Sequence, residues 1–273
     1  MTDVKVDTLC LDGFSMDYCR FGRGQTPLII LPGLSLQRVM GSAKAIAGAY
    51  RLLADDFTIY VFERRNDMPD TYPISDMARD TASALEALDI GSACLFGASQ
   101  GGMIAMEIAI TRPRLVRRMI VGSSSARVTP EVFERFVPWI QMAREEKAGE
   151  LLLMMSKALY PREVFEPLRP LLLEMAEGIT AEDFRRFIIQ TEAIRGFDRL
   201  DDVNKIACPV LVIGARDDRV LDGESSVQIA ERLADRPDCA LYMYDQYGHA
   251  VYDLAPDYRQ RMRSFFVSCS HRQ

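Results

Sequence analysis

The sequence predicts an α/β fold whose central sheet is mostly parallel, flanked by helices and interrupted by a helical insertion. Short apolar runs such as 28–31, 93–96 and 210–213 alternate with longer stretches of helical periodicity. Uninterrupted apolar runs of this length are typical of strands buried on both faces of a parallel sheet. Between about 128 and 200 this alternation stops, and the pattern is helical throughout.

The extended elements follow one another along the chain. A hairpin is expected over about 6–21, because Asp12-Gly13 separates two extended runs and Asp-Gly favours a tight hairpin turn. Helices are expected over 77–88 and 103–110, where apolar residues recur at helical spacing. The remaining strands are expected at the apolar runs 28–31, 58–62, 93–96, 119–121, 210–213 and 240–244.

The insertion contains its own helix signals. Thr129-Pro130 is typical of a helix start, with proline at the first helical position. Apolar spacing indicates further helices over 151–159 and 164–175, and Thr180 with Asp183 resembles a capping box that opens another. We therefore predict one α/β core domain formed by 1–127 and 201–273, with residues 128–200 inserted as a helical cap, or lid.

Composition excludes several classes of function. The 273 residues include 33 Lys and Arg against 39 Asp and Glu, and this net charge of −6 argues against a nucleic-acid partner. The six cysteines are scattered and form no C-x-x-C pair, so we expect no metal. The nucleotide-binding motifs G-x-x-x-x-G-K-[ST] and G-x-G-x-x-G after a strand are both absent from the sequence, so we expect no cofactor. Neither a signal segment nor a membrane span is recognisable, which predicts a cytoplasmic protein without a membrane partner. The residues described below indicate that its partner is a small-molecule substrate. The sequence does not indicate an oligomeric state.

The segment Gly97-Ala98-Ser99-Gln100-Gly101 carries the clearest chemical signal. This G-x-S-x-G sequence directly follows one expected strand and directly precedes a helix, as a nucleophile elbow requires. Such a tight turn needs small flanking residues and lifts the serine hydroxyl clear of the sheet. Ser99 is therefore the expected nucleophile.

A serine nucleophile requires a base and a carboxylate that orients the base. The chain has two histidines; His271 is third from the end, whereas His249 follows the expected strand 240–244. His249 is thus placed at the carboxyl edge of the sheet, where such folds bind ligands, and is the expected base. Asp217 and Asp218 both follow the strand 210–213, and because they are adjacent only one of them can face the imidazole.

This order of serine, acid and histidine resembles the α/β-hydrolase superfamily, in particular its capped, esterase-like serine hydrolases. The resemblance covers nearly the whole chain, with the helical insertion matching the family's cap. In that family the acid commonly stands three residues after a glycine at the strand end, which here selects Asp217 over Asp218. The resemblance therefore implies a Ser99-His249-Asp217 triad.

The resemblance also implies an oxyanion hole made of two backbone N–H groups. One belongs to Gln100, which follows the nucleophile, and the other is assigned to Leu34 in the loop after the strand 28–31. Many family members have His-Gly where this chain has Pro32-Gly33, which leaves the bonding around this loop open.

We therefore expect a hydrolase of a small or medium, partly apolar ester, lactone or thioester, acting through an acyl-enzyme. C–C bond hydrolysis, perhydrolysis and acyl transfer remain alternatives, as does a ligand-binding or signalling protein with a hydrolase-like pocket. Arg64 and Arg65 follow a strand, and a surface ion pair is favoured there over contact with an anionic substrate. Apolar cap side chains are mostly core formers, but some are expected to line the substrate pocket: Phe133, Phe136, Trp139 and Met142.

Overall fold

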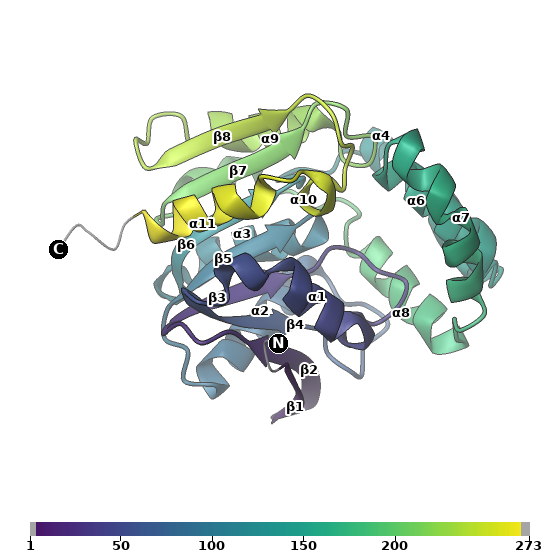
Figure 1. The fold of residues 1–273 in the computed structure, drawn as a ribbon, viewed down its shortest axis with the longest axis horizontal. Helices are drawn as coiled ribbons and strands as arrows, with labels where there is room; N and C mark the ends of the chain where they lie inside the picture. The colour runs from purple at the N-terminus through teal and green to yellow at the C-terminus, as the bar shows by residue number, and fades with distance from the viewer. Residues whose placement is uncertain (1–3, 269–273) are drawn as a thin grey trace.

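The computed structural model describes residues 4–268 and contains one eight-stranded sheet with the strand order β1-β2-β4-β3-β5-β6-β7-β8 (Figure 1). From β3 to β8 every neighbouring pair is parallel, while β2 pairs antiparallel with both β1 and β4. The predicted mostly parallel α/β sheet and the N-terminal hairpin are thereby confirmed. The strands are β1 (Lys5–Leu11), β2 (Phe14–Phe21), β3 (Thr26–Leu31), β4 (Phe57–Phe62), β5 (Ala93–Ala98), β6 (Val116–Gly122), β7 (Val210–Ala215) and β8 (Cys239–Tyr244).

Helices cover both faces of this sheet. Successive residues of β5 enter different apolar cores, with Leu95 in the core beneath α2, α3 and the inserted helices and Phe96 in the core beneath α1 and α11. This division follows from the twofold alternation of side chains along a strand. The helices outside the insertion are α1 (Ala43–Ala49), α2 (Ile74–Ala87), α3 (Gln100–Thr111), α9 (Gly223–Glu231), α10 (Val251–Leu254) and α11 (Tyr258–Val267), with 3-10 turns η1 (Val39–Ser42), η2 (Arg51–Leu53), η3 (Pro113–Leu115) and η4 (Leu200–Lys205).

The helices between β6 and β7 form a separate group, toward which the carboxyl ends of β7 and β8 point in Figure 1. The chain enters and leaves this group at one place, because Arg127 and Asp198 form an isolated β-bridge and a 2.7 Å ion pair. The cap boundaries at 128 and 200 stay a prediction. The inserted helices are α4 (Pro130–Phe133), α5 (Val137–Arg144), α6 (Ala148–Leu159), α7 (Arg162–Ala176) and α8 (Ala181–Glu192).

The starts of two inserted helices match the sequence signals. Thr129 caps α4, and Thr180 with Asp183 forms the capping box of α8. The helix that starts at Pro130 ends at Phe133, and the chain is helical again only from Val137, so that α4 and α5 are divided. Pro138 explains the division, because a proline has no N–H to continue the helical bonding and its ring clashes with the preceding turn. Among residues 4–268, no helix combines the length and the apolar character needed to cross a membrane.

Candidate active site

Ser99 lies at the junction between β5 and α3, with a backbone conformation that few non-glycine residues adopt. Its φ is 53° and its ψ is −122°, and the residue is 8% exposed. The Ser99 N–H donates to the Gly122 carbonyl over 2.8 Å, while the Ser124 hydroxyl donates to the Ser99 carbonyl over 2.7 Å. Neighbouring β6 therefore holds the turn in place, and such imposed strain is typical of functional positions.

The glycines of the motif are required by close backbone approaches. A Cβ added to Gly97 would lie 2.2 Å from the Gly101 carbonyl oxygen, and one added to Gly101 would lie 1.9 Å from the Leu31 carbonyl oxygen. Neither position has space for a side chain, because the start of α3 packs directly on β3 and β5. The sequence motif thus forms the sharp strand–turn–helix elbow that was predicted around Ser99.

His249 lies between β8 and α10 and contacts a buried carboxylate. Its Nδ1 atom is 2.8 Å from Oδ2 of Asp218, and the two residues are 1% and 7% exposed. The other carboxylate oxygen of Asp218 accepts hydrogen bonds from the Val220 and Leu221 N–H groups, over 2.8 and 3.2 Å. Burial raises the pKa of Asp218, but His249 and these backbone donors outweigh it, so that its pKa is lowered overall.

The prediction that Asp217 faces His249 is wrong. Asp217 instead accepts a 2.9 Å hydrogen bond from the Gly248 N–H, on the backbone beside the histidine. The glycine used for counting, Gly214, lies inside β7 rather than at its end, so the loop begins one residue later than expected. A turn closed by the Asp218 N–H and the Ala215 carbonyl then leaves Asp217 half-buried and turns Asp218 inward.

The two segments proposed to supply the oxyanion hole lie beside Ser99. A Cβ on Gly33 would be 3.1 Å from the Ser99 Cβ and 3.7 Å from its Oγ, which places the loop that carries Leu34 against the nucleophile. Gln100 is the first residue of α3 and is fully buried, and its side-chain amide donates to the Gln190 carbonyl over 2.6 Å. Gln100 thereby connects the elbow to α8 of the insertion.

The aromatic side chains expected in the substrate pocket pack against one another. Phe133, Phe136 and Trp139 are at most 5% exposed. The ring centroid of Phe136 lies 5.8 Å from that of Phe133 and 5.1 Å from that of Trp139. The Arg195 guanidinium covers the Phe133 ring at 3.9 Å, and Met142 is partly buried against the same core. The structure therefore places these residues in the core of the inserted helices, and their contact with substrate stays a prediction.

Arg64 departs from the surface ion pair favoured by the sequence. It is 5% exposed, and its Nη2 donates to the Pro32 carbonyl over 2.7 Å and to Oε1 of Gln100 over 3.4 Å. Neighbouring Arg65 does form an ion pair, with Asp80 at 3.6 Å. Arg64 could not be assigned from sequence, because two consecutive arginines after a strand look solvent-exposed whichever of them turns inward.

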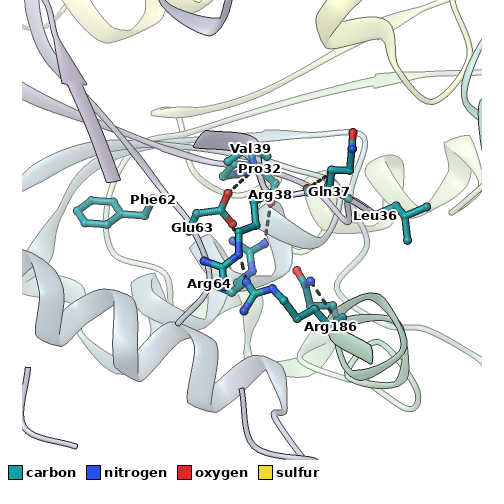
Figure 2. Close-up of a pocket in the computed structure, with 12 residues that line it drawn as sticks. Pro32, Leu36, Gln37, Arg38, Val39, Phe62, Glu63, Arg64 and Arg186 are labelled. Carbon is teal, nitrogen blue, oxygen red and sulfur yellow. Dashed lines mark hydrogen bonds and ion pairs between the residues drawn. The ribbon is translucent and has the colours of Figure 1, made fainter. Parts of the chain in front are cut away.

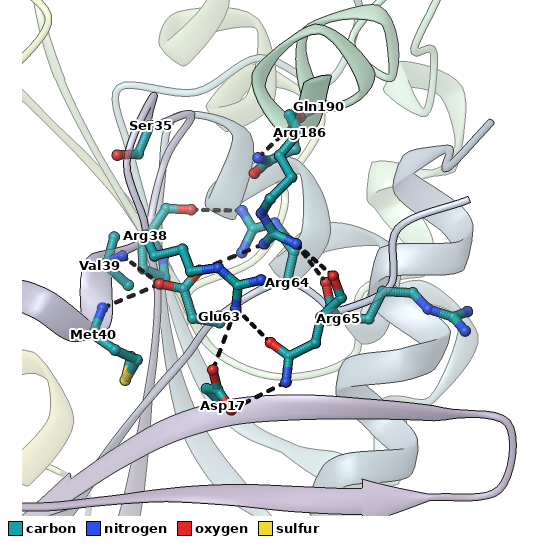
Figure 3. Close-up of polar contacts among 12 residues, drawn as sticks. Asp17, Ser35, Arg38, Val39, Met40, Glu63, Arg64, Arg65, Arg186 and Gln190 are labelled. Atoms are coloured by element: carbon teal, nitrogen blue, oxygen red, sulfur yellow. Dashed lines mark hydrogen bonds and ion pairs between the residues drawn. The ribbon is translucent and has the colours of Figure 1, made fainter. Parts of the chain in front are cut away.

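Two further charged residues, Glu63 and Arg186, lie near Arg64, and the sequence analysis did not single them out (Figure 3). Arg186 of α8 donates to the carbonyls of Arg65 and Asn66, over 3.0 and 2.9 Å. Glu63 accepts from the Val39 N–H and, over 3.1 Å, from the Met40 N–H. Burial raises the pKa of Glu63, although these hydrogen bonds and the neighbouring guanidinium groups oppose the shift. The result is a buried polar cluster behind the loop after β3.

A mostly parallel sheet with a serine in a strained strand–turn–helix elbow is typical of α/β hydrolases, and comparison with known families gives the same class. The model of the alpha/beta hydrolase family matches residues 28–259, and the chain belongs to that family. It is a hydrolase of the alpha/beta hydrolase fold.

Relatives in sequence share most of the chain. Two proteins named "Putative carbamate hydrolase RutD" align with it: the one from Rhizobium rhizogenes is 27% identical over 80% of this chain and 85% of its own, and the one from Agrobacterium fabrum is 26% identical over 79% and 85%.

Solved structures share the fold at lower identity. The enol-lactonase from Burkholderia xenovorans has a TM-score of 0.81 at 18% identity, covering 95% of this chain and 99% of its own. The esterase RhEst1 from Rhodococcus sp. has a TM-score of 0.76 at 21% identity, covering 97% and 98%. The hydrolase MGS-M2 from a deep-sea metagenome has a TM-score of 0.84 at 18% identity, covering 95% of this chain and 97% of its own.

Proposed function

We propose that this protein is a serine hydrolase that cleaves a small or medium, partly apolar ester, lactone or thioester through a covalent acyl-enzyme. The observation that carries the proposal is the buried 2.8 Å contact between Asp218 and His249, at the sheet edge where Ser99 is held in a strained turn. A serine with positive φ and an ionised carboxylate buried against an imidazole are both uncommon outside nucleophilic sites. Asp218 replaces Asp217 in the proposed triad.

The contact with Asp218 sets the tautomer of the histidine. Asp218 has a lowered pKa and is ionised at neutral pH, so its carboxylate accepts a hydrogen bond from the N–H group at Nδ1 of His249. The other ring nitrogen, Nε2, is then unprotonated and is the base that accepts the Ser99 hydroxyl proton. As this proton leaves, the Ser99 oxygen bonds to the substrate carbonyl carbon, whose oxygen becomes negatively charged.

The negative oxygen requires donors that are already in place. We assign this role to the backbone N–H groups of Gln100 and Leu34, since the first opens α3 and the second belongs to the loop beside Ser99. Collapse of the tetrahedral intermediate transfers the proton from His249 to the leaving alcohol, which departs. Water then attacks the acyl-enzyme, with the same histidine as base, and releases the acid.

The relatives support a heteroatom leaving group on a carbonyl carbon. The named activities among them are those of a lactonase, an esterase and a carbamate hydrolase. A carbamate is a second candidate substrate, because two relatives that share about four-fifths of the chain carry that name. The proposed triad would attack a carbamoyl carbon in the same way as an ester carbonyl.

A fluorophosphonate probe with mass-spectrometric mapping tests the nucleophile. We expect Ser99 to be labelled, and Ser99→Ala to lose both labelling and turnover of 4-nitrophenyl esters while it keeps the melting temperature of the wild type. The exposed Ser42 offers a matched control, since Ser42→Ala removes a hydroxyl that has no part in the proposed chemistry. Undiminished turnover by Ser99→Ala would refute the mechanism.

The same experiment separates the alternatives. Labelling of Ser99 without hydrolysis of any ester would indicate C–C bond hydrolysis, perhydrolysis or acyl transfer by the same residues. A folded wild-type protein that the probe does not label would instead indicate a ligand-binding protein with a hydrolase-like pocket.

A further inference from the structure

A small polar cavity lies against the loop after β3, and the side chains of three arginines contribute to its wall (Figure 2). Its volume is about 20 Å³. Gly33 lines this cavity and also faces the nucleophile, because a Cβ on Gly33 would lie 3.1 Å from the Ser99 Cβ. Gly33, which has no side chain, is therefore adjacent both to the cavity and to the proposed catalytic serine. The charged residues of its wall are Arg38, Glu63, Arg64 and Arg186.

The charges around the cavity do not balance. Arg38 is paired with Asp17 at 3.3 Å, and Arg186 with Glu63 at 4.0 Å. Within residues 4–268, no carboxylate lies within 4.0 Å of the Arg64 guanidinium. Its Nε atom is buried and has no hydrogen-bond partner there, although the residue is only 5% exposed. One buried positive charge, with one unused N–H, remains after the ion pairs are assigned.

A buried guanidinium without an anionic partner destabilises the folded protein unless a ligand binds to it. Removing a cation from water without an anionic partner is strongly destabilising, and buried N–H groups are almost always hydrogen-bonded. Burial lowers the pKa of Arg64 to about 10, opposed by Tyr72 and Glu63 and assisted by Arg186. The side chain is still charged at neutral pH, so the electrostatic demand for an anion persists in the folded protein.

We propose that this cavity binds a carboxylate carried by the substrate, through the Arg64 guanidinium, while the scissile carbonyl lies at Ser99. The inference rests on the proposed function, because it specifies the substrate of the same site. One uncompensated positive charge calls for a monoanion, and the planar guanidinium matches the two oxygens of a carboxylate. The cavity has room for about one or two water-sized groups, which suits carboxylate oxygens and not an aromatic ring.

The neighbourhood restricts the substrate further. Because Gly33 adjoins both Ser99 and the cavity, we infer that a short spacer joins the carboxylate to the scissile carbonyl. The substrate class is therefore a half-ester of a short dicarboxylic acid, or a related carboxylate-bearing lactone or carbamate. Its neutral analogues lack the group that compensates Arg64.

Two esters of similar length test the proposal directly: the 4-nitrophenyl half-ester of glutaric acid and the neutral 4-nitrophenyl hexanoate. We expect the wild type to prefer the half-ester in kcat/KM, and Arg64→Met to lower kcat/KM for the half-ester about ten- to hundredfold more than it lowers kcat/KM for the hexanoate. Arg64→Lys should retain part of the preference, since it keeps the charge. Arg65→Met is the matched control, because that neighbouring arginine already pairs with Asp80.

A structural role for Arg64 gives a different result. Arg64 also donates to the Pro32 carbonyl, so a residue that only positions this loop would, when replaced, lower kcat/KM for both esters by the same factor. Equal losses for the two esters, or no preference in the wild type, would overturn the proposal.

Thermal unfolding supplies a readout that does not need turnover. At constant ionic strength, glutarate should raise the melting temperature of the wild type and of Ser99→Ala, and leave that of Arg64→Met unchanged. Stabilisation by acetate without a kinetic preference for the half-ester would mean that the site holds a free anion, against our proposal. If neither ester is hydrolysed but glutarate stabilises through Arg64, the proposed reaction fails while the anion site stands.

Discussion

The two adjacent aspartates after β7 offer a sharp test of the proposed triad. Asp218→Asn keeps the size of the side chain, and an amide oxygen can still accept from the Val220 and Leu221 N–H groups. The amide NH2 group that faces His249 then donates a hydrogen bond where the carboxylate accepted one. Nδ1 of His249 is forced into the unprotonated form, the proton moves to Nε2, and the base that should activate Ser99 is lost.

The expected loss can be estimated from this change. Inverting the tautomer in a serine triad lowers turnover about 10⁴-fold, which corresponds to about 5.4 kcal/mol at 1.36 kcal/mol per tenfold. The cost in stability should be smaller, about 2 kcal/mol at pH 7, since only the bond to the imidazole is replaced. Because the folded pKa of Asp218 is lowered, its stabilising effect is full above the unfolded value of about 3.9 and is lost as the pH falls through the folded value.

Asp217→Asn is the matched control, one residue away. Its amide oxygen can still accept the Gly248 N–H, and it does not contact the histidine, so kcat/KM should stay within about threefold of the wild type. Both variants are assayed with the same 4-nitrophenyl ester between pH 5 and pH 9, with melting temperatures measured in parallel. An active Asp218→Asn together with an inactive Asp217→Asn would refute the assignment and restore the spacing rule of the family.

Three other predictions concern the scaffold of the site. Gly101→Ala should lower the melting temperature by roughly 6–12 °C, because its Cβ would meet a backbone oxygen of β3 at 1.9 Å and overpacking of this kind costs about 3 kcal/mol; a melting temperature equal to that of the wild type would contradict this. Arg199→Met should lower the free energy of unfolding in urea by about 2 kcal/mol, since it leaves the buried carboxylate of Glu107 without its partners at 2.6 and 2.9 Å; an unchanged urea midpoint would show that this pair is dispensable. Iodoacetamide at pH 8 should alkylate the exposed Cys10 and spare Cys94, whose pKa burial raises to about 11, so that about one thiol in a thousand is thiolate; rapid labelling of Cys94 in peptide maps would indicate that β5 opens.

The sequence was sufficient for those features that local chemistry determines. Uninterrupted apolar runs predicted the strands, and the glycines around Ser99 predicted the elbow, because a Cβ added to Gly101 or Gly97 would lie only 1.9 or 2.2 Å from a backbone oxygen. The choice between Asp217 and Asp218 failed for a physical reason. It depends on where β7 ends, which pairing with β6 and β8 decides, and a shift of one residue reverses which side chain points inward.

Two departures that looked unrelated in the sequence are joined in the structure. Pro32 stands where many family members have histidine, and Arg64 is buried although a surface ion pair was expected for it. The Arg64 guanidinium donates a hydrogen bond to the Pro32 carbonyl over 2.7 Å. The same guanidinium reaches the side chain of Gln100, at the other segment proposed to bind the oxyanion. Arg64 thus contacts both sides of the proposed oxyanion hole while one of its N–H groups and its charge stay unmatched. A residue that only holds this loop in place would need no charge, because a neutral amide or hydroxyl group can also donate a hydrogen bond to a carbonyl oxygen. The burial of a full charge at this position is therefore better explained by a negatively charged ligand that this particular hydrolase must recognise.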